Sequence, residues 1–122
     1  MFRVLLVEDS RRLTDWLRET ISALDGVELV AAVADETSAV EVATDSSVDA
    51  IILDLQLRQG TGFGVVERLG IRRPTIIVFT NYVLPEYQRR AAALGIEYFL
   101  NKARDYELLP QLIQELGQRQ QA

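Results

Sequence analysis

Short apolar runs alternate with stretches of helical periodicity along the whole chain. The runs predict buried strands at residues 3–7, 27–33, 50–53, 74–79 and 98–100. In the first intervening stretch, apolar positions recur every three or four residues: Leu13, Trp16, Leu17, Thr20, Ile21 and Leu24. This spacing predicts a helix with Trp16 on its core-facing side, capped by either Asp9 or Ser10.

Four further helices are predicted between and after the other strands. They cover residues 35–44, a segment from residue 62, residues 85–94, and a last helix from about residue 107 to Gly117. Pro110 suits only a first helical turn, so an irregular turn is expected before residue 107. Residues 118–122 are expected to fray.

Five strands that alternate with five helices indicate a parallel sheet with right-handed crossovers and helices on both faces. Strands apolar on both faces agree with this, because central parallel strands are buried on both sides. The fold class is therefore α/β, a doubly wound (βα)5 unit of three layers. With 122 residues and no linker or repeat, the whole of residues 1–122 is expected to be one domain.

Composition removes several kinds of chemistry. The chain contains neither histidine nor cysteine, which excludes Ser-His and Cys-His nucleophile pairs and zinc sites built on imidazole or thiolate. Any metal must be held by oxygen ligands, which favours Mg²⁺, Mn²⁺ or Ca²⁺.

The net charge and the hydropathy of the chain indicate which partners it binds and where in the cell it is located. The net charge of −5 argues against direct nucleic-acid binding as the main role of this domain, because phosphate neutralisation needs a concentrated basic surface. No apolar run is long enough to span a membrane, and the start of the chain is too short and too acidic for a signal peptide. A cytoplasmic location is expected.

Residues with carboxylate, hydroxyl or ammonium side chains follow four of the five predicted strands. They are Glu8 and Asp9, Asp54, Thr80, and Lys102. In an open parallel sheet these positions meet at the carboxyl edge, where ligands bind. Carboxylates gathered there repel one another unless a cation neutralises them. Mg²⁺ with Lys102 would suit a carboxylate that attacks phosphorus and forms an aspartyl phosphate.

The chain resembles the response-regulator receiver domains of two-component signalling over essentially its whole length. The resemblance is carried by VLLVEDS, IILDLQL, IIVFTN and YFLNKA at the ends of the first, third, fourth and fifth strands. It implies a flavodoxin-like sheet with strand order 2-1-3-4-5.

The resemblance also implies a role for each site residue. Asp54 is the expected phosphoacceptor, and Mg²⁺, with Mn²⁺ as a substitute, is held by four ligands: Glu8, Asp9, Asp54 and the backbone carbonyl of Gln56. Lys102 and Thr80 are expected to contact the phosphoryl group. Thr80 and Phe99 are the expected switch residues, which alter the surface of the fourth helix, fifth strand and fifth helix.

The expected partners follow from the same resemblance. Because the chain has no histidine, a histidine kinase or histidine phosphotransfer protein must supply the phosphoryl group. The output is a downstream protein or a missing effector domain, since no effector domain is visible, and a homodimer through the switch surface fits the family. The chain is expected to be a phosphoacceptor with intrinsic autodephosphorylation, not a turnover enzyme.

Some positions depart from the family pattern. Ala103 replaces a common proline, and Asn81 and Tyr82 follow the switch threonine where a small residue is usual. The larger side chains are expected to change how fast water removes the phosphate. Asn81 and Ala103 also keep open the alternative of a receiver-like interaction module that works without phosphorylation.

Other functions fit less well. An aspartyl phosphatase of the haloacid dehalogenase type needs a second aspartate where this chain has Gln56, and a flavin carrier would bring its phosphate against Glu8 and Asp9. The glycine-rich segment 60–64 lacks the GK[ST] ending of a phosphate loop, so a flexible loop and helix start is expected. The apolar residues Val83, Leu84 and Tyr87 suit a partner-binding patch or local packing.

Overall fold

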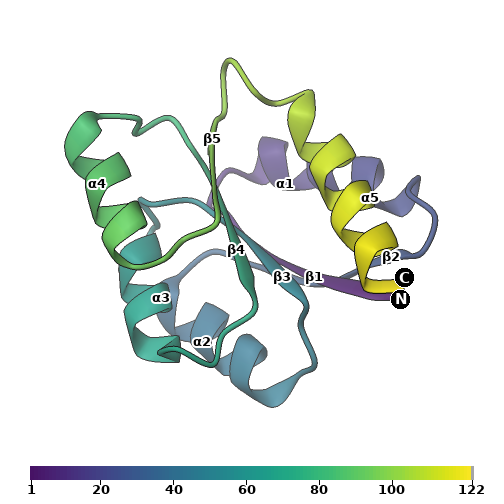
Figure 1. Cartoon of the computed structure of the whole chain (residues 1–122), viewed down its shortest axis with the longest axis horizontal. Helices are drawn as coiled ribbons and strands as arrows, with labels where there is room; N and C mark the ends of the chain where they lie inside the picture. The colour runs from purple at the N-terminus through teal and green to yellow at the C-terminus, as the bar shows by residue number, and fades with distance from the viewer. Residues whose placement is uncertain (122) are drawn as a thin grey trace.

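The computed structural model describes residues 1–121 and contains a five-stranded parallel sheet between two layers of helices (Figure 1). The elements are β1 (Phe2–Val7), α1 (Arg11–Ser22), β2 (Val27–Val33), α2 (Glu36–Asp45), β3 (Ala50–Leu53), α3 (Gly62–Leu69), β4 (Thr75–Thr80), α4 (Pro85–Ala93), β5 (Tyr98–Asn101) and α5 (Leu108–Gln121). The strand order is β2-β1-β3-β4-β5, which confirms the predicted doubly wound fold.

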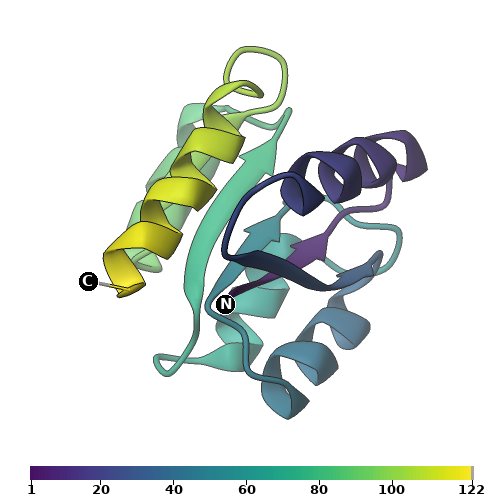
Figure 2. The same cartoon turned by 90° about the vertical axis from the view of Figure 1, so that its right-hand side faces the viewer.

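The core consists of two clusters of buried apolar side chains, one on each face of the sheet. Leu17 and Ile21 of α1 and Leu109 and Ile113 of α5 pack on one face. Helices α2, α3 and α4 cover the other face, so that α1 and α2 lie on opposite sides of the strands (Figure 2). Because β1, β3 and β4 are buried from both sides, their sequences are almost entirely apolar.

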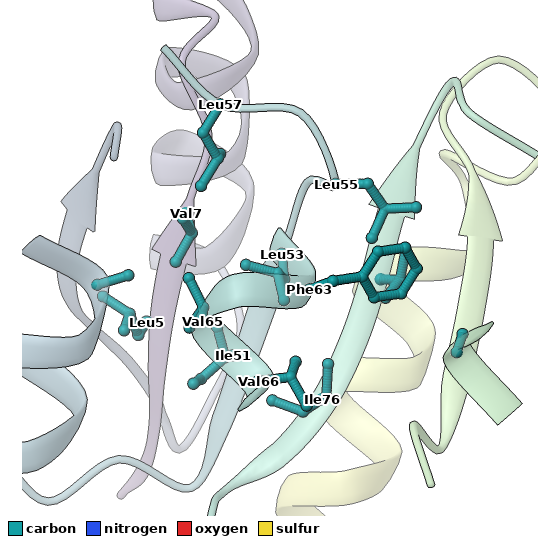
Figure 3. Packing of buried hydrophobic residues seen from close by; sticks show 13 residues of the cluster. Leu5, Val7, Ile51, Leu53, Leu55, Leu57, Phe63, Val65, Val66 and Ile76 are labelled. Carbon is teal, nitrogen blue, oxygen red and sulfur yellow. The ribbon is translucent and has the colours of Figure 1, made fainter. Parts of the chain in front are cut away.

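The second cluster reaches beyond the strands into the β3–α3 loop. Leu55 and Leu57 of this loop are 5% and 7% exposed. Leu57 points toward Val7 of β1, and Leu55 lies beside Phe63 of α3 (Figure 3). Burial of these two leucines anchors the segment that directly follows Asp54.

The structure corrects where the last helix ends. Helix α5 continues through Gln121, whereas the sequence predicted an end at Gly117. Gly117 lies against Phe2, where an added Cβ would come within 3.3 Å of the Phe2 side chain. The glycine therefore permits a close approach of α5 to the sheet. Beyond Gly117, the side chain of Gln120 donates a hydrogen bond to Asp49 Oδ1 at 3.0 Å. The prediction for Ala122 lies outside the described residues.

Trp16 is less buried than predicted. Its side chain packs against the core cluster beneath α1 but remains partly exposed. The ring meets Tyr106 edge-on at 6.1 Å between centroids. Periodicity indicated the correct side of α1, but Trp16 occupies the rim of the core.

Candidate functional site

Glu8, Asp54 and Lys102 form a buried ionic cluster at the carboxyl edge of the sheet. The Lys102 ammonium lies 2.7 Å from Asp54 Oδ2 and 2.8 Å from Glu8 Oε1. Glu8 and Asp54 are each only 5% exposed. Burial strengthens the attraction in this cluster, and it makes an unneutralised carboxylate costly there.

Backbone hydrogen bonds extend the strand ladders up to these residues. The Glu8 amide donates to Val33 O at 2.9 Å, the Asp54 amide to Val7 O at 3.1 Å, and the Lys102 amide to Thr80 O at 2.9 Å. Each functional side chain is therefore fixed at its Cα by a neighbouring strand.

The start of α1 orients Glu8 and leaves Asp9 available. Ser10 caps the helix, accepting from the Leu13 amide at 3.3 Å, and its own amide donates to Glu8 Oε2 at 2.9 Å. This settles which of the two candidate residues is the cap. With Ser10 as the cap, the Asp9 carboxylate joins the cluster.

Burial and pairing shift two pKa values in this cluster. Burial raises the pKa of Glu8 above its usual value of 4.5, and hydrogen bonds from Lys102 and Ser10 offset only part of the effect. Burial acts to lower the pKa of Lys102, but its hydrogen bonds to Asp54 and Glu8 outweigh burial and hold the pKa above 10.5. Lys102 therefore stays charged at neutral pH.

The carboxylates suit a hard divalent cation. One oxygen from each of Glu8, Asp9 and Asp54 lies within 4.8 Å of the other two. Asp54 Oδ1 is buried and has no hydrogen-bond partner, although Oδ2 is held by Lys102. Since a buried oxygen without a partner is costly, the donor set and this oxygen together fit a cation such as Mg²⁺.

A surface cavity of about 330 Å³ opens beside Glu8 and Asp9. Arg11, Arg18 and Arg58 also line it, together with Asp15, so three arginines lie along the cavity beside the acidic site. The sequence analysis did not identify Arg58 as a site residue. The signal for it was its position four residues after Asp54, in the loop at the carboxyl edge.

The remaining predicted site residues lie around the cluster without joining it. Thr80 is fully buried, and its hydroxyl oxygen accepts from the Tyr82 amide at 3.1 Å. Phe99 is partly buried and packs against the core cluster beneath α3 and α4. Gln56 lies in the β3–α3 loop, two residues after Asp54, with its side chain exposed.

The comparisons with known proteins identify the class of domain. The family model described as "Response regulator receiver domain" matches residues 4–114, and the chain therefore belongs to this family. Receiver domains of this family act in two-component systems, where phosphorylation of an aspartate and binding of a divalent metal by acidic residues are typical. They interact with kinases and effector domains.

Two curated bacterial relatives are considerably longer than this chain. Protein-glutamate methylesterase/protein-glutamine glutaminase 2 of Carboxydothermus hydrogenoformans is 29% identical over 108 residues, covering 88% of this chain and 29% of that protein. The transcriptional regulatory protein DesR of Bacillus subtilis is 26% identical over 116 residues, covering 95% of this chain and 58% of that protein. The chain therefore spans less than two thirds of the length of each of these relatives.

Solved structures share the fold. The response regulator domain of Thermotoga maritima CheB has a TM-score of 0.84 at 20% identity, with 97% of this chain and 95% of that chain covered. A DNA-binding LuxR-family response regulator from Staphylococcus aureus has a TM-score of 0.85 at 20% identity, with 96% and 99% covered. The Mn²⁺-bound form of response regulator Rcp1 has a TM-score of 0.78 at 21% identity, with 95% and 91% covered.

Hydropathy adds one finding. Within residues 1–121, none of the helices combines the length and the apolar character that crossing a bilayer requires.

Proposed function

We propose that this receiver domain accepts a phosphoryl group on Asp54 from a phosphohistidine of a histidine kinase or histidine phosphotransfer protein. The observation that carries the proposal is the asymmetry of the Asp54 carboxylate. Lys102 holds Oδ2 at 2.7 Å, whereas Oδ1 is buried without a partner beside Glu8 and Asp9. A carboxylate held in this way offers Oδ1 to a cation and leaves Oδ2, beside Lys102, to attack phosphorus.

The transfer replaces one phosphorus bond with another. Asp54 Oδ2 forms a bond to phosphorus as the phosphorus–nitrogen bond of the phosphohistidine breaks. The imidazole leaves with the bonding electron pair and takes a proton from solvent. Lys102, which stays charged because its pKa is raised, compensates negative charge on a phosphoryl oxygen.

Glu8, Asp9, Asp54 and the backbone carbonyl of Gln56 are the residues that would hold Mg²⁺, or Mn²⁺ in its place. The three carboxylates supply oxygen ligands close enough to share one ion. When bound, the ion supplies positive charge that neutralises the oxygens of the transferring group.

Thr80 and Phe99 are proposed as the switch. In the unphosphorylated protein Thr80 Oγ1 accepts from the Tyr82 amide. An aspartyl phosphate would offer the Thr80 hydroxyl an acceptor and draw it from that position, with Phe99 moving inward. The surface of α4, β5 and α5 would then change for a downstream protein, an effector domain or a second copy of the chain.

The proposal describes a signalling module, not a turnover enzyme. Residues 1–122 act as a single receiver domain in the cytoplasm, with intrinsic autodephosphorylation of Asp54. The net charge of −5 agrees with output through protein contacts, without direct nucleic-acid binding by this domain.

Mass spectrometry of the intact chain tests the proposal. Incubation with acetyl phosphate and Mg²⁺ should add one phosphoryl group that hydroxylamine removes, as expected for an acyl phosphate. Asp54→Asn should remove the adduct, because the amide is a much weaker nucleophile than the carboxylate. Asp25→Asn, a change at an exposed residue outside the site, should label like the parent chain.

Two outcomes would contradict the proposal. Equal labelling of Asp54→Asn would place the acceptor elsewhere. Failure of the parent chain to label, with acetyl phosphate and with a phosphorylated kinase, would favour an interaction module that works without phosphorylation.

A further inference from the structure

The carboxylate of Glu36 crosses from α2 to the β3–α3 loop. Glu36 is the first residue of α2, and its side chain is 21% exposed. Its Oε1 accepts from the Thr61 amide at 3.0 Å, and its Oε2 lies 3.3 Å from Arg68 Nη1. One side chain thus holds both the end of the loop and the last turn of α3.

The backbone makes a second connection between the same segments. The Glu36 amide donates to Gln59 O at 3.0 Å, and Asp35 pairs with Gln59 in an isolated parallel bridge. The loop is therefore attached to α2 on both sides of Gly60.

The glycines of segment 60–64 make room for this contact. A Cβ on Gly60 would overlap the Glu36 Cβ, and a Cβ on Gly64 would overlap Glu36 Oε1. Gly60 also has a φ of 85°, which other residues rarely adopt. The segment is a close-packed contact, not the flexible loop that its composition indicated, although α3 does begin at Gly62 as predicted.

The contact is joined to the proposed metal site through one short stretch of backbone. Gln56 and Thr61 pair in an antiparallel bridge, and the Gly62 amide donates to Leu55 O at 2.9 Å. Holding the Thr61 amide therefore restrains Gln56, which lies opposite it. The Gln56 carbonyl is the one proposed ligand that comes from loop backbone.

We propose that Glu36 is a positioning residue that holds the Gln56 carbonyl in place for the divalent cation. This inference rests on the proposed function, which supplies the role of Gln56. Glu36 does not contact the ion; it acts through the Thr61 amide. Its loss should loosen the loop and weaken cation binding while Glu8, Asp9 and Asp54 keep their positions.

Three single variants separate the two contacts of Glu36. Glu36→Ala removes both the acceptor for Thr61 and the partner of Arg68. Glu36→Gln keeps an oxygen that accepts from Thr61 but loses the charge. Arg68→Ala removes the ion pair and the hydrogen bond from Arg68 to Thr37 Oγ1, and it leaves the acceptor for Thr61 in place. Circular dichroism first establishes that each variant is folded.

Mg²⁺ affinity by calorimetry and amide exchange of Thr61 by NMR are the readouts. Glu36→Ala should bind Mg²⁺ about tenfold more weakly, as when an outer-shell partner of a metal ligand is lost. Its Thr61 amide should exchange faster in the metal-free protein. Glu36→Gln and Arg68→Ala should stay close to the parent chain in both measurements. The labelling rate of Glu36→Ala should recover at saturating Mg²⁺, which general damage to the fold would not allow.

A double-mutant cycle provides a second route to the same conclusion. In Gly64→Ala the new methyl group displaces the Glu36 carboxylate, so Mg²⁺ affinity should fall although alanine favours a helix. In Glu36→Ala the space is already empty, and adding Gly64→Ala should change the affinity little further.

The outcomes are distinguishable. Unchanged Mg²⁺ affinity in folded Glu36→Ala would overturn the inference, and so would a Glu36→Gln variant as weak as Glu36→Ala. If the parent chain neither binds Mg²⁺ nor labels on Asp54, the proposed function fails and the positioning role fails with it. A parent chain that binds Mg²⁺ and labels, with no effect of Glu36→Ala, would overturn only the positioning role.

Discussion

Asp9 differs from the other carboxylates of the cluster in how it is held. Glu8 and Asp54 are both paired with Lys102, whereas among residues 1–121 Asp9 takes no part in those ion pairs. One ammonium therefore faces three carboxylates, and one oxygen from each lies within 4.8 Å of the other two. Without a cation, the third carboxylate adds repulsion that folding must overcome.

Asp9→Asn should stabilise the metal-free protein, because it removes one of the repelling charges. The expected gain is about 1 kcal/mol, or roughly 4 °C in Tm for a chain of this length. Millimolar Mg²⁺ should raise the Tm of the parent chain, since the ion binds the folded cluster, and should raise that of Asp9→Asn much less. Thermal unfolding with and without Mg²⁺ measures both effects.

Asp25→Asn is the control for net charge, because Asp25 is exposed and lies outside the cluster. It should leave the response to Mg²⁺ unchanged. A metal-free Asp9→Asn protein less stable than its parent would contradict the repulsion argument.

At the scale of elements, the connection from β5 to α5 is a tightly bonded turn that carries Lys102. Asp105 Oδ2 accepts from the Asn101 amide at 2.9 Å, and the Asp105 amide donates to Asn101 O at 2.8 Å. Asn101 Oδ1 in turn accepts from the Ala103 amide at 2.8 Å. Lys102 is thus held in place by its neighbours as well as by its ion pairs.

Asp105 should make the stability of this turn depend on pH. The hydrogen bond from the Asn101 amide, followed by that from Arg104, lowers the pKa of Asp105 below 3.8. A depressed pKa contributes stability that is fully present above pH 3.8, the unfolded value, and is lost as the pH falls through the lower folded value.

Asp105→Asn should therefore be less stable than the parent chain at neutral pH, and the difference should shrink below pH 3.8. Urea unfolding of both proteins from pH 7 to pH 3 measures it. A difference that stays constant with pH would show that the Asp105 charge does not contribute.

At the scale of the whole molecule, each of the two helical layers packs on the sheet through the apolar side of its helices. On α5, the neighbours Leu108 and Leu109 are 49% and 0% exposed, and they form a matched pair. Leu109→Ala should lower the free energy of unfolding by about 2–5 kcal/mol, because it leaves a cavity in the core beneath α1 and α5. Leu108→Ala should change it by less than about 1 kcal/mol.

Urea denaturation of both variants tests this arrangement of α5. Equal losses would mean that α5 does not pack on the sheet through the face that contains Leu109 and Ile113.

Local patterning was sufficient to predict the class of architecture, whereas the strand order was predicted from the family resemblance. Each strand is a short apolar run and each helix has its own periodicity, so the order of elements follows from neighbouring residues alone. Because the carboxyl ends of parallel strands lie at one edge of the sheet, the sequence also predicted that Glu8, Asp54 and Lys102 lie close together. Their chemical roles stay predictions until Asp54 labelling is measured.

Contacts between distant segments were decided only by the tertiary structure. The pattern left both Asp9 and Ser10 as caps, and it set the end of α5 at Gly117 because a glycine ordinarily breaks a helix. It also gave no sign that Glu36 meets Thr61, 25 residues later. These features depend on how side chains from separate elements pack against one another. Local sequence patterns do not specify such contacts, because the residues that make them are far apart in the chain.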